Sequence, residues 1–335
     1  MIPAIFGLSG LTLTDDERAF FRDSQPAGYI LFGRNIANRE QLRRLTDDLR
    51  ALDGRAGLPI LIDQEGGRVA RMKAPEWPDF PSGEAFDQLY ERAPASAIEA
   101  ARLNAMALAS MLSEVGITVD CLPLLDVRQP GASDVIGDRA LGSEPMRVAA
   151  LGRAILSGLQ DGGVVGIVKH IPGHGRAMLD SHEELPTVTA SDHDLQTDLA
   201  PFAALRDAAM AMTCHVIFTA WDPDRPATLS PTIIDRIIRQ KVGFHGLLMT
   251  DDLDMKALSG DVPSRAADAI AAGCDIALNC WARMDDMIGI ANALDPISTV
   301  SRARLEGAMD RIAVAQEARH FEQLVDQRDA LLAMA

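Results

Sequence analysis

The sequence predicts a (β/α)8 TIM barrel, an α/β fold in which eight parallel strands alternate with helices. Eight short apolar runs of strand length are distributed along the 335 residues, and stretches with helical periodicity separate most of them. A doubly wound sheet is the competing layout, but the count of eight strands favours the barrel. We expect a single domain over residues 1–335, because no Pro-, Ser- or Gly-rich linker divides the chain.

The expected strands are apolar runs, several of which end in a charged or polar residue. In chain order they cover residues 4–8, 29–32, 59–63, 118–122, 166–170, 210–215, 247–251 and 276–279.

Helices are expected between the strands. The stretch 38–52 begins with a plausible N-cap, Asn38, and carries leucines in one helical stripe. The Ala-rich stretch 95–115 ends before Gly116, a typical helix stop. Further helices are expected at residues 145–163, 195–208, 231–242, 264–272 and 284–294. A barrel of this kind needs about 250 residues, so we assign the excess to long βα loops, above all residues 65–94, and to an extra C-terminal helical segment, residues 301–332.

Composition and charge limit the partners of the chain. With 47% apolar and 24% charged residues the chain has enough material for a large core. The net charge of −16 argues against binding to nucleic acid or to an anionic membrane surface. A small-molecule substrate is expected instead, and no obligate protein partner is evident.

Cysteine usage and the N-terminus predict a cytoplasmic protein. The four cysteines lie in or beside apolar runs without the paired spacing of a zinc motif, so free thiols in a reducing compartment are expected: Cys121, Cys214, Cys274 and Cys280. The first residues have no basic region, and no apolar run approaches the roughly 18 residues that span a bilayer.

Polar residues follow the ends of the predicted strands. In a (β/α)8 barrel these ends and the loops after them build the active site. We therefore expect one polar rim formed by Asp63, Glu65, Arg68, Arg71, Asp126, Arg139, Lys169, His170, His215, Asp251 and Asp252. Charged side chains make strong hydrogen bonds to sugar hydroxyl and amide groups. For Arg71 and Arg139, a purely structural ion pair is an equal alternative.

Asp251 ends the seventh predicted strand. A carboxylate at the end of a buried strand is costly unless it is hydrogen-bonded or functional. The structural alternative is a helix N-cap, which Asp252 or Asp254 would provide equally well, so we interpret Asp251 as catalytic.

The most informative segment follows the fifth strand and contains Lys169-His170-Ile171-Pro172-Gly173-His174-Gly175 and then Asp180-Ser181-His182. A carboxylate close to an imidazole fixes its tautomer and tunes its basicity, so Asp180 and His182 are a candidate acid/base unit on a glycine-containing loop. A zinc site formed by His170, His174, Asp180 and His182 is the alternative, but Pro172 and the glycines prevent a helical ligand arrangement. No nucleotide-type glycine loop follows the early strands, so no cofactor and no metal are expected.

Five strings resemble glycoside hydrolase family 3, most closely its single-domain NagZ-type β-N-acetylglucosaminidases of bacterial peptidoglycan recycling. They are LIDQEGGRVARM at 61–72, VIGDRALG at 135–142, KHIPGHG at 169–175, DSHEELP at 180–186 and TDDLDMKA at 250–257. Ile171 is a small departure, since phenylalanine is commoner there, and it affects no chemical group.

The resemblance implies a retaining exo-β-N-acetylhexosaminidase (EC 3.2.1.52). Asp251 would be the nucleophile and His182 the general acid/base, oriented by Asp180. The N-acetylglucosamine unit would be bound by Asp63, Arg71, Arg139, Lys169 and His170. The implied substrate is a muropeptide, in which a β-1,4 bond joins N-acetylglucosamine to 1,6-anhydro-N-acetylmuramic acid.

Two alternatives remain on the same scaffold. A neutral imidazole repels anions less than a carboxylate does, so phosphate could replace water and make the enzyme a phosphorylase. A non-catalytic sugar-binding barrel is disfavoured, because Asp251 and the Asp180–His182 pair are intact.

Overall fold

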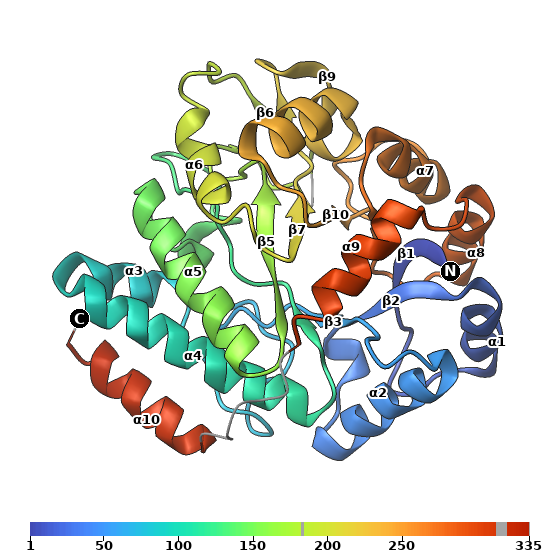
Figure 1. Cartoon of the computed structure of the whole chain (residues 1–335), viewed down its shortest axis with the longest axis horizontal. Helices are drawn as coiled ribbons and strands as arrows, with labels where there is room; N and C mark the ends of the chain where they lie inside the picture. The colour runs from blue at the N-terminus through green and yellow to red at the C-terminus, as the bar shows by residue number, and fades with distance from the viewer. Residues whose placement is uncertain (182–183, 313–319, 335) are drawn as a thin grey trace.

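The computed structural model describes residues 1–181, 184–312 and 320–334, and it contains a closed barrel of eight parallel strands. The barrel and its surrounding helices confirm the predicted fold class (Figure 1). The strands, in their order around the barrel, are β1 (Ile2–Gly7), β2 (Pro26–Leu31), β3 (Ile60–Ile62), β4 (Val119–Asp120), β5 (Val165–Ile171), β7 (Met210–Thr213), β10 (Leu247–Asp252) and β11 (Ile276–Asn279), and β11 pairs with β1 to close the ring. All eight predicted strands are present, although β1 and β2 begin two and three residues earlier than expected.

The seven helices predicted between the strands are also present. Asn38 caps the first of them as expected, because its side chain accepts a hydrogen bond from the amide of Gln41 at 2.9 Å. One, η4, has the wider winding of a π-helix. The helices are α2 (Arg39–Asp53), α4 (Pro94–Glu114), α5 (Pro145–Asp161), α6 (Gln196–Ala204), η4 (Ile233–Val242), α7 (Val262–Ala272) and α8 (Met284–Ala293).

Several elements were not predicted. Helix α1 (Asp15–Ser24) follows a capping box in which Thr14 and Glu17 bond reciprocally. Helix α3 (Gly83–Arg92) occupies the end of the stretch 65–94, so describing that whole stretch as a loop was wrong. A small additional sheet contains β6 (Thr187–Val188), β8 (Ile217–Phe218) and β9 (Asp222–Pro226), and three short 3-10 helices are η1 (Gly33–Asn35), η2 (Gly137–Arg139) and η3 (Ala227–Leu229).

The expected C-terminal helical segment consists of two helices, α9 (Thr299–Met309) and α10 (Phe321–Leu332), and residues 313–319 between them lie outside the described residues. Helix α9 contacts β10, whereas α10 packs along α4 (Figure 1).

Two apolar clusters form the core. One fills the barrel interior with side chains such as Ile30, Leu61, Ile167 and Met249, and the other lies between the strands and the surrounding helices. Because the interior is filled, the polar residues at the carboxyl ends of the strands face the open end of the barrel.

The four cysteines are free and buried, as the sequence predicted. None of the helices in the described ranges combines the length and the apolar character that crossing a membrane requires.

Candidate active site

A cavity of about 350 Å³ lies at the carboxyl end of the barrel. Seven of the eight predicted site residues line it: Asp63, Arg71, Arg139, Lys169, His170, Asp180 and Asp251. The eighth, His182, lies outside the described residues. The barrel therefore brings together side chains from the ends of β3, β5 and β10 and from the loops after β3, β4 and β5.

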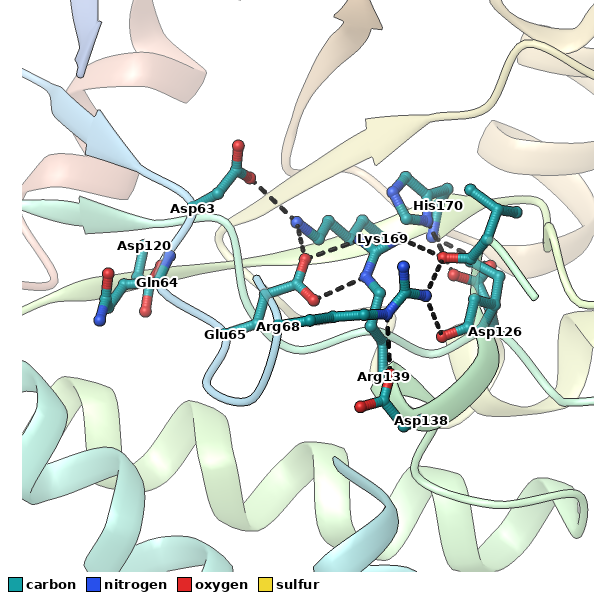
Figure 2. Close-up of polar contacts among 12 residues, drawn as sticks. Asp63, Gln64, Glu65, Arg68, Asp120, Asp126, Asp138, Arg139, Lys169 and His170 are labelled. Atoms are coloured by element: carbon teal, nitrogen blue, oxygen red, sulfur yellow. Dashed lines mark hydrogen bonds and ion pairs between the residues drawn. The ribbon is translucent and has the colours of Figure 1, made fainter. Parts of the chain in front are cut away.

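One wall of the cavity is an ion-pair network centred on Lys169. Its Nζ lies 3.1 Å from Asp63 Oδ1 and 2.7 Å from Glu65 Oε1, and the lysine side chain is 2% exposed. Figure 2 shows Lys169 extending between these two carboxylates and Arg139 meeting Glu65 from the other side. Arg139 binds Glu65 with two nitrogens, at 2.7 and 2.8 Å. Such charge-assisted contacts fix the wall before any ligand binds.

The network keeps its carboxylates ionised. Burial alone would raise the pKa of Asp63, but Lys169 and Arg71 outweigh burial and hold it well below its usual range. Burial likewise opposes ionisation of Glu65, yet Lys169 and Arg139 lower its pKa. Burial would lower the pKa of Lys169, but the same two carboxylates raise it. The wall thus presents fixed charges at neutral pH.

Arg71 and Arg139 combine the two interpretations that the sequence left open. Each makes a structural ion pair, Arg71 with Asp63 at 3.1 Å and Arg139 with Glu65, and each also lines the cavity. The Arg71 guanidinium additionally lies over the Phe32 ring, 5.4 Å from its centroid.

A second network organises the segment after β5. Asp126 Oδ2 is 2.7 Å from His170 Nδ1, and its other oxygen accepts hydrogen bonds from the amides of His170 and His174. The His174 ring reaches Ser181, with Nε2 and Oγ 3.1 Å apart. Ser181 directly follows Asp180, so this second network, through His174, holds the part of the loop that carries Asp180.

Asp251 is the ionised member of two neighbouring aspartates at the cavity floor. Burial would raise the pKa of Asp251, but His170, His215 and the amide of Asp252 outweigh it and lower the pKa. For Asp252, burial and the adjacent Asp254 raise the pKa above its usual range, so its carboxyl group is the harder of the two to ionise. The helix N-cap alternative for Asp251 is wrong, since the next helix, α7, is capped by Asp261.

Three contributors to the site had no specific role in the sequence-based prediction. Glu65 and Asp126 were expected on the polar rim, and His174 was named only as a ligand of the zinc alternative. In the structure Glu65 and His174 line the cavity, and Asp126 holds the segment after β5. The signal for Glu65 was its position in Asp63-Gln64-Glu65, directly after β3. His215, expected on the polar rim, is fully buried and hydrogen-bonds Thr228 and the Asp252 carbonyl instead of lining the cavity.

The zinc alternative finds no ligand set in the part of the chain that the structure describes, where no group of three or more His, Cys, Asp or Glu side chains could hold a metal ion. His182, one of its four candidate ligands, is outside that part.

Stability is expected to depend on His174 between about pH 4 and 6.5. Burial, reinforced by His170, lowers the pKa of His174 from 6.5 to about 4. In this window the unfolded chain binds a proton that the folded chain does not, so acid favours unfolding. The stabilisation of the folded state by neutral His174 is complete above pH 6.5. As the pH falls from 6.5 to 4, the free energy of unfolding decreases by about 3 kcal/mol. Urea unfolding at pH 7 and 4.5 should show a larger loss for the wild type than for His174→Gln, because glutamine does not titrate. Equal losses in the two proteins would contradict the burial of a neutral imidazole.

Comparison with known proteins assigns this chain to a family. The chain matches the model of the glycosyl hydrolase family 3 N-terminal domain over residues 6–315. It therefore belongs to glycosyl hydrolase family 3. A relative from Aromatoleum aromaticum named Beta-hexosaminidase is 38% identical over 315 residues, which cover 92% of this chain and 87% of the relative.

Solved structures agree with the family. NagZ from Neisseria gonorrhoeae, in complex with N-trifluoroacetyl-D-glucosamine, is 32% identical, superposes with a TM-score of 0.88, and the match covers 98% of each chain. A family 3 β-N-acetylglucosaminidase from Paenibacillus sp. is 31% identical with a TM-score of 0.85, and the match covers 98% of this chain but 66% of that protein.

Proposed function

We propose that residues 1–335 form a single catalytic domain, a retaining exo-β-N-acetylhexosaminidase. The chain is a glycoside hydrolase of the β-N-acetylhexosaminidase class, as its curated relatives named Beta-hexosaminidase and its similarity to NagZ support. The observation that carries the detailed proposal is an ionised aspartate, Asp251, at the floor of the same cavity that Asp180 lines.

The cavity suits one terminal amino sugar. Its volume of about 350 Å³ is near the lower end of the range for small-molecule sites, about 300–1,000 Å³, which favours removal of one sugar at a time. Asp63, Arg71, Arg139, Lys169 and His170 would bind the hydroxyl and amide groups of that sugar. The similar NagZ structure with N-trifluoroacetyl-D-glucosamine supports an N-acylated glucosamine as the ligand class.

The reaction proceeds in two displacements. In the first, a carboxylate oxygen of Asp251 attacks the anomeric carbon as the glycosidic bond breaks, and protonated His182 donates its proton to the leaving oxygen. In the second, neutral His182 accepts a proton from water, whose oxygen attacks the same carbon and releases Asp251. An unperturbed imidazole, with a pKa of about 6.5, can perform both proton transfers near neutral pH. Asp180 stabilises the imidazolium form.

We further propose that the natural substrate is a muropeptide and that the reaction belongs to peptidoglycan recycling in the cytoplasm. The single-domain length shared with NagZ supports this choice, because the match covers 98% of both chains. Four buried free thiols fit a reducing compartment.

Hydrolysis of the disaccharide N-acetylglucosaminyl-β-1,4-(1,6-anhydro-N-acetylmuramic acid) tests the proposal. Proton NMR should show β-N-acetylglucosamine as the first product, which establishes retention. In phosphate buffer the same product is expected. Release of a sugar 1-phosphate would instead identify a phosphorylase, and no turnover of any β-N-acetylhexosaminide would contradict the enzyme assignment.

The variant His182→Ala is expected to lose activity in proportion to the basicity of the leaving group. Poor leaving groups need the proton that His182 supplies, so their kcat/KM should fall about 10²–10⁴-fold, whereas good leaving groups such as dinitrophenolate should be much less affected. A series of aryl β-N-acetylglucosaminides measures this dependence. A uniform small loss across the series would remove the general-acid assignment.

A further inference from the structure

The C-terminal helix α10 carries a buried arginine on its apolar face. Arg328 is 5% exposed. It interrupts a helically spaced series of core-packing side chains, namely Phe321, Leu324, Val325, Leu331 and Leu332. A buried charge commonly adds no more stability than a well-packed apolar side chain of similar volume. Apolar packing alone therefore does not explain an arginine at this position.

Arg328 contacts two elements outside its own helix. Its Nη1 donates a hydrogen bond to Asn104 Oδ1 of α4 at 3.0 Å. Its guanidinium lies over the Phe80 ring, 5.4 Å from the centroid, and Phe321 of α10 meets the same ring edge-on at 6.4 Å. The remaining guanidinium contacts go to Asp329 on the same helix. Helix α10 thus holds Phe80 with two side chains.

Phe80 supports the turn that carries Glu65. The Phe80 carbonyl accepts a hydrogen bond from the amide of Gly67 at 2.8 Å. A Cβ atom on Gly66 would lie 2.2 Å from the Pro81 carbonyl oxygen, and Gly66 has a φ of +97°. The turn can approach the 80–82 segment this closely only with glycine there. Glu65 and its turn therefore rest directly on the segment that α10 holds.

Helix α10 is also connected to the site through Asn104, the residue that Arg328 hydrogen-bonds. Asn104 lines a small cavity of about 20 Å³ together with Glu65 and Arg139, a volume with room for about one water molecule. Glu65 and Arg139 also line the active-site cavity, so this ion pair separates the two cavities. The Arg328–Asn104 hydrogen bond fixes the opposite wall of the small one.

We propose that Arg328 is a positioning residue for the amino-sugar site, acting through Phe80 and Asn104 on the turn that carries Glu65. The part of this proposal that concerns sugar binding rests on the proposed function above. Helix α10 lies beyond residues 6–315, which the family model matches. The element that supports the Glu65 turn is therefore outside the matched part of the chain.

The test compares Arg328→Met with matched variants in two measurements. Methionine keeps the apolar packing of α10 but removes the hydrogen bond and the stacked cation. Hydrogen exchange of the amides in residues 65–72 should become about tenfold faster, while exchange in β10 stays unchanged. KM for an aryl β-N-acetylglucosaminide should rise about tenfold, equivalent to about 1.4 kcal/mol, with kcat within about threefold.

Three controls separate positioning from general stability. Gln327→Met, on the exposed face of the same helix, should leave both readouts unchanged. Ile290→Ala, buried in α8, should destabilise the barrel without a selective effect on residues 65–72. Arg328→Lys, which retains a donor for Asn104, should recover part of the wild-type KM. If Arg328→Met does not fold, Phe321→Leu removes only the edge-on ring contact and should give a smaller increase in exchange at the same residues.

If the amides of residues 65–72 exchange at the same rate in Arg328→Met as in the wild type, the proposal is overturned. A uniform rise across the barrel, as in Ile290→Ala, would overturn it as well. The exchange measurement requires no activity. Failure of the wild type to hydrolyse any β-N-acetylhexosaminide would therefore contradict the proposed function, whereas the exchange rates would still test whether α10 supports the turn that carries Glu65.

Discussion

Replacing Asp251 with alanine is expected to lower kcat for an aryl β-N-acetylglucosaminide by at least about 10⁴-fold, because losing the nucleophile of a covalent mechanism removes the first step itself. Asp252 is a poor replacement, since burial and Asp254 raise its pKa and oppose the ionised form that a nucleophile needs. Steady-state kinetics with a matched control, Asp261→Ala, measures the loss. Asp261 is an exposed helix cap away from the cavity, so that control should retain nearly full activity.

Chemical rescue sharpens the assignment. Azide added to Asp251→Ala should enter the space of the missing carboxylate, form a bond to the anomeric carbon and displace the activated leaving group in one step. The product is then the α-glycosyl azide, with inverted configuration. Near-normal turnover of the variant without azide, or a β-azide product, would show that Asp251 is not the nucleophile.

The second large effect is expected for Lys169→Met. This change leaves the buried carboxylates of Asp63 and Glu65 without the cation that lies 3.1 and 2.7 Å from them. Breaking a buried ion pair from one side costs about 3–5 kcal/mol, and the sugar site loses its charge pattern at the same time. Urea unfolding should record the lower free energy of unfolding, and kcat/KM should fall by about 10³-fold or more, which corresponds to about 4 kcal/mol.

Two comparisons make that prediction specific. Lys241→Met removes a surface lysine that pairs with exposed Asp192, and it should cost at most about 1 kcal/mol. The double variant Lys169→Met/Asp63→Asn should recover part of the stability, because it removes one of the two carboxylates that lost the lysine, and the other partner of Asp63, Arg71, is 31% exposed and stays hydrated. Unchanged stability in the single variant would show that the Lys169 network does not hold the cavity wall.

The strands of the barrel were predictable because they are buried on both faces and contain continuous apolar runs, as in Leu247-Leu248-Met249 at the start of β10. The small sheet was not predictable for the opposite reason. Its longest strand, Asp222–Pro226, contains two prolines and three charged residues, a composition typical of a turn. Helix α1 was missed although its capping box, Thr14 with Glu17, is visible in the sequence.

The cavity-lining residues were predictable from one geometric rule, which places the ends of all barrel strands at one rim. Their pairings were not. Arg139 binds Glu65 across 74 positions of the chain and His170 binds Asp126 across 44. A single sequence contains no signal for which carboxylate meets which cation over such separations. For this reason the pairing of Glu65 with Arg139 and that of Asp126 with His170 emerged only from the structure.

The most direct measurement of the central claim is to trap the glycosyl-enzyme. A slowly turned-over 2-deoxy-2-fluoro glycoside with an activated leaving group should accumulate a covalent ester, and peptide mass mapping should locate the added sugar on Asp251, in the peptide that contains Thr250-Asp251-Asp252. A label on any other residue, or an active enzyme that forms no covalent adduct while inverting the anomeric configuration, would contradict the account.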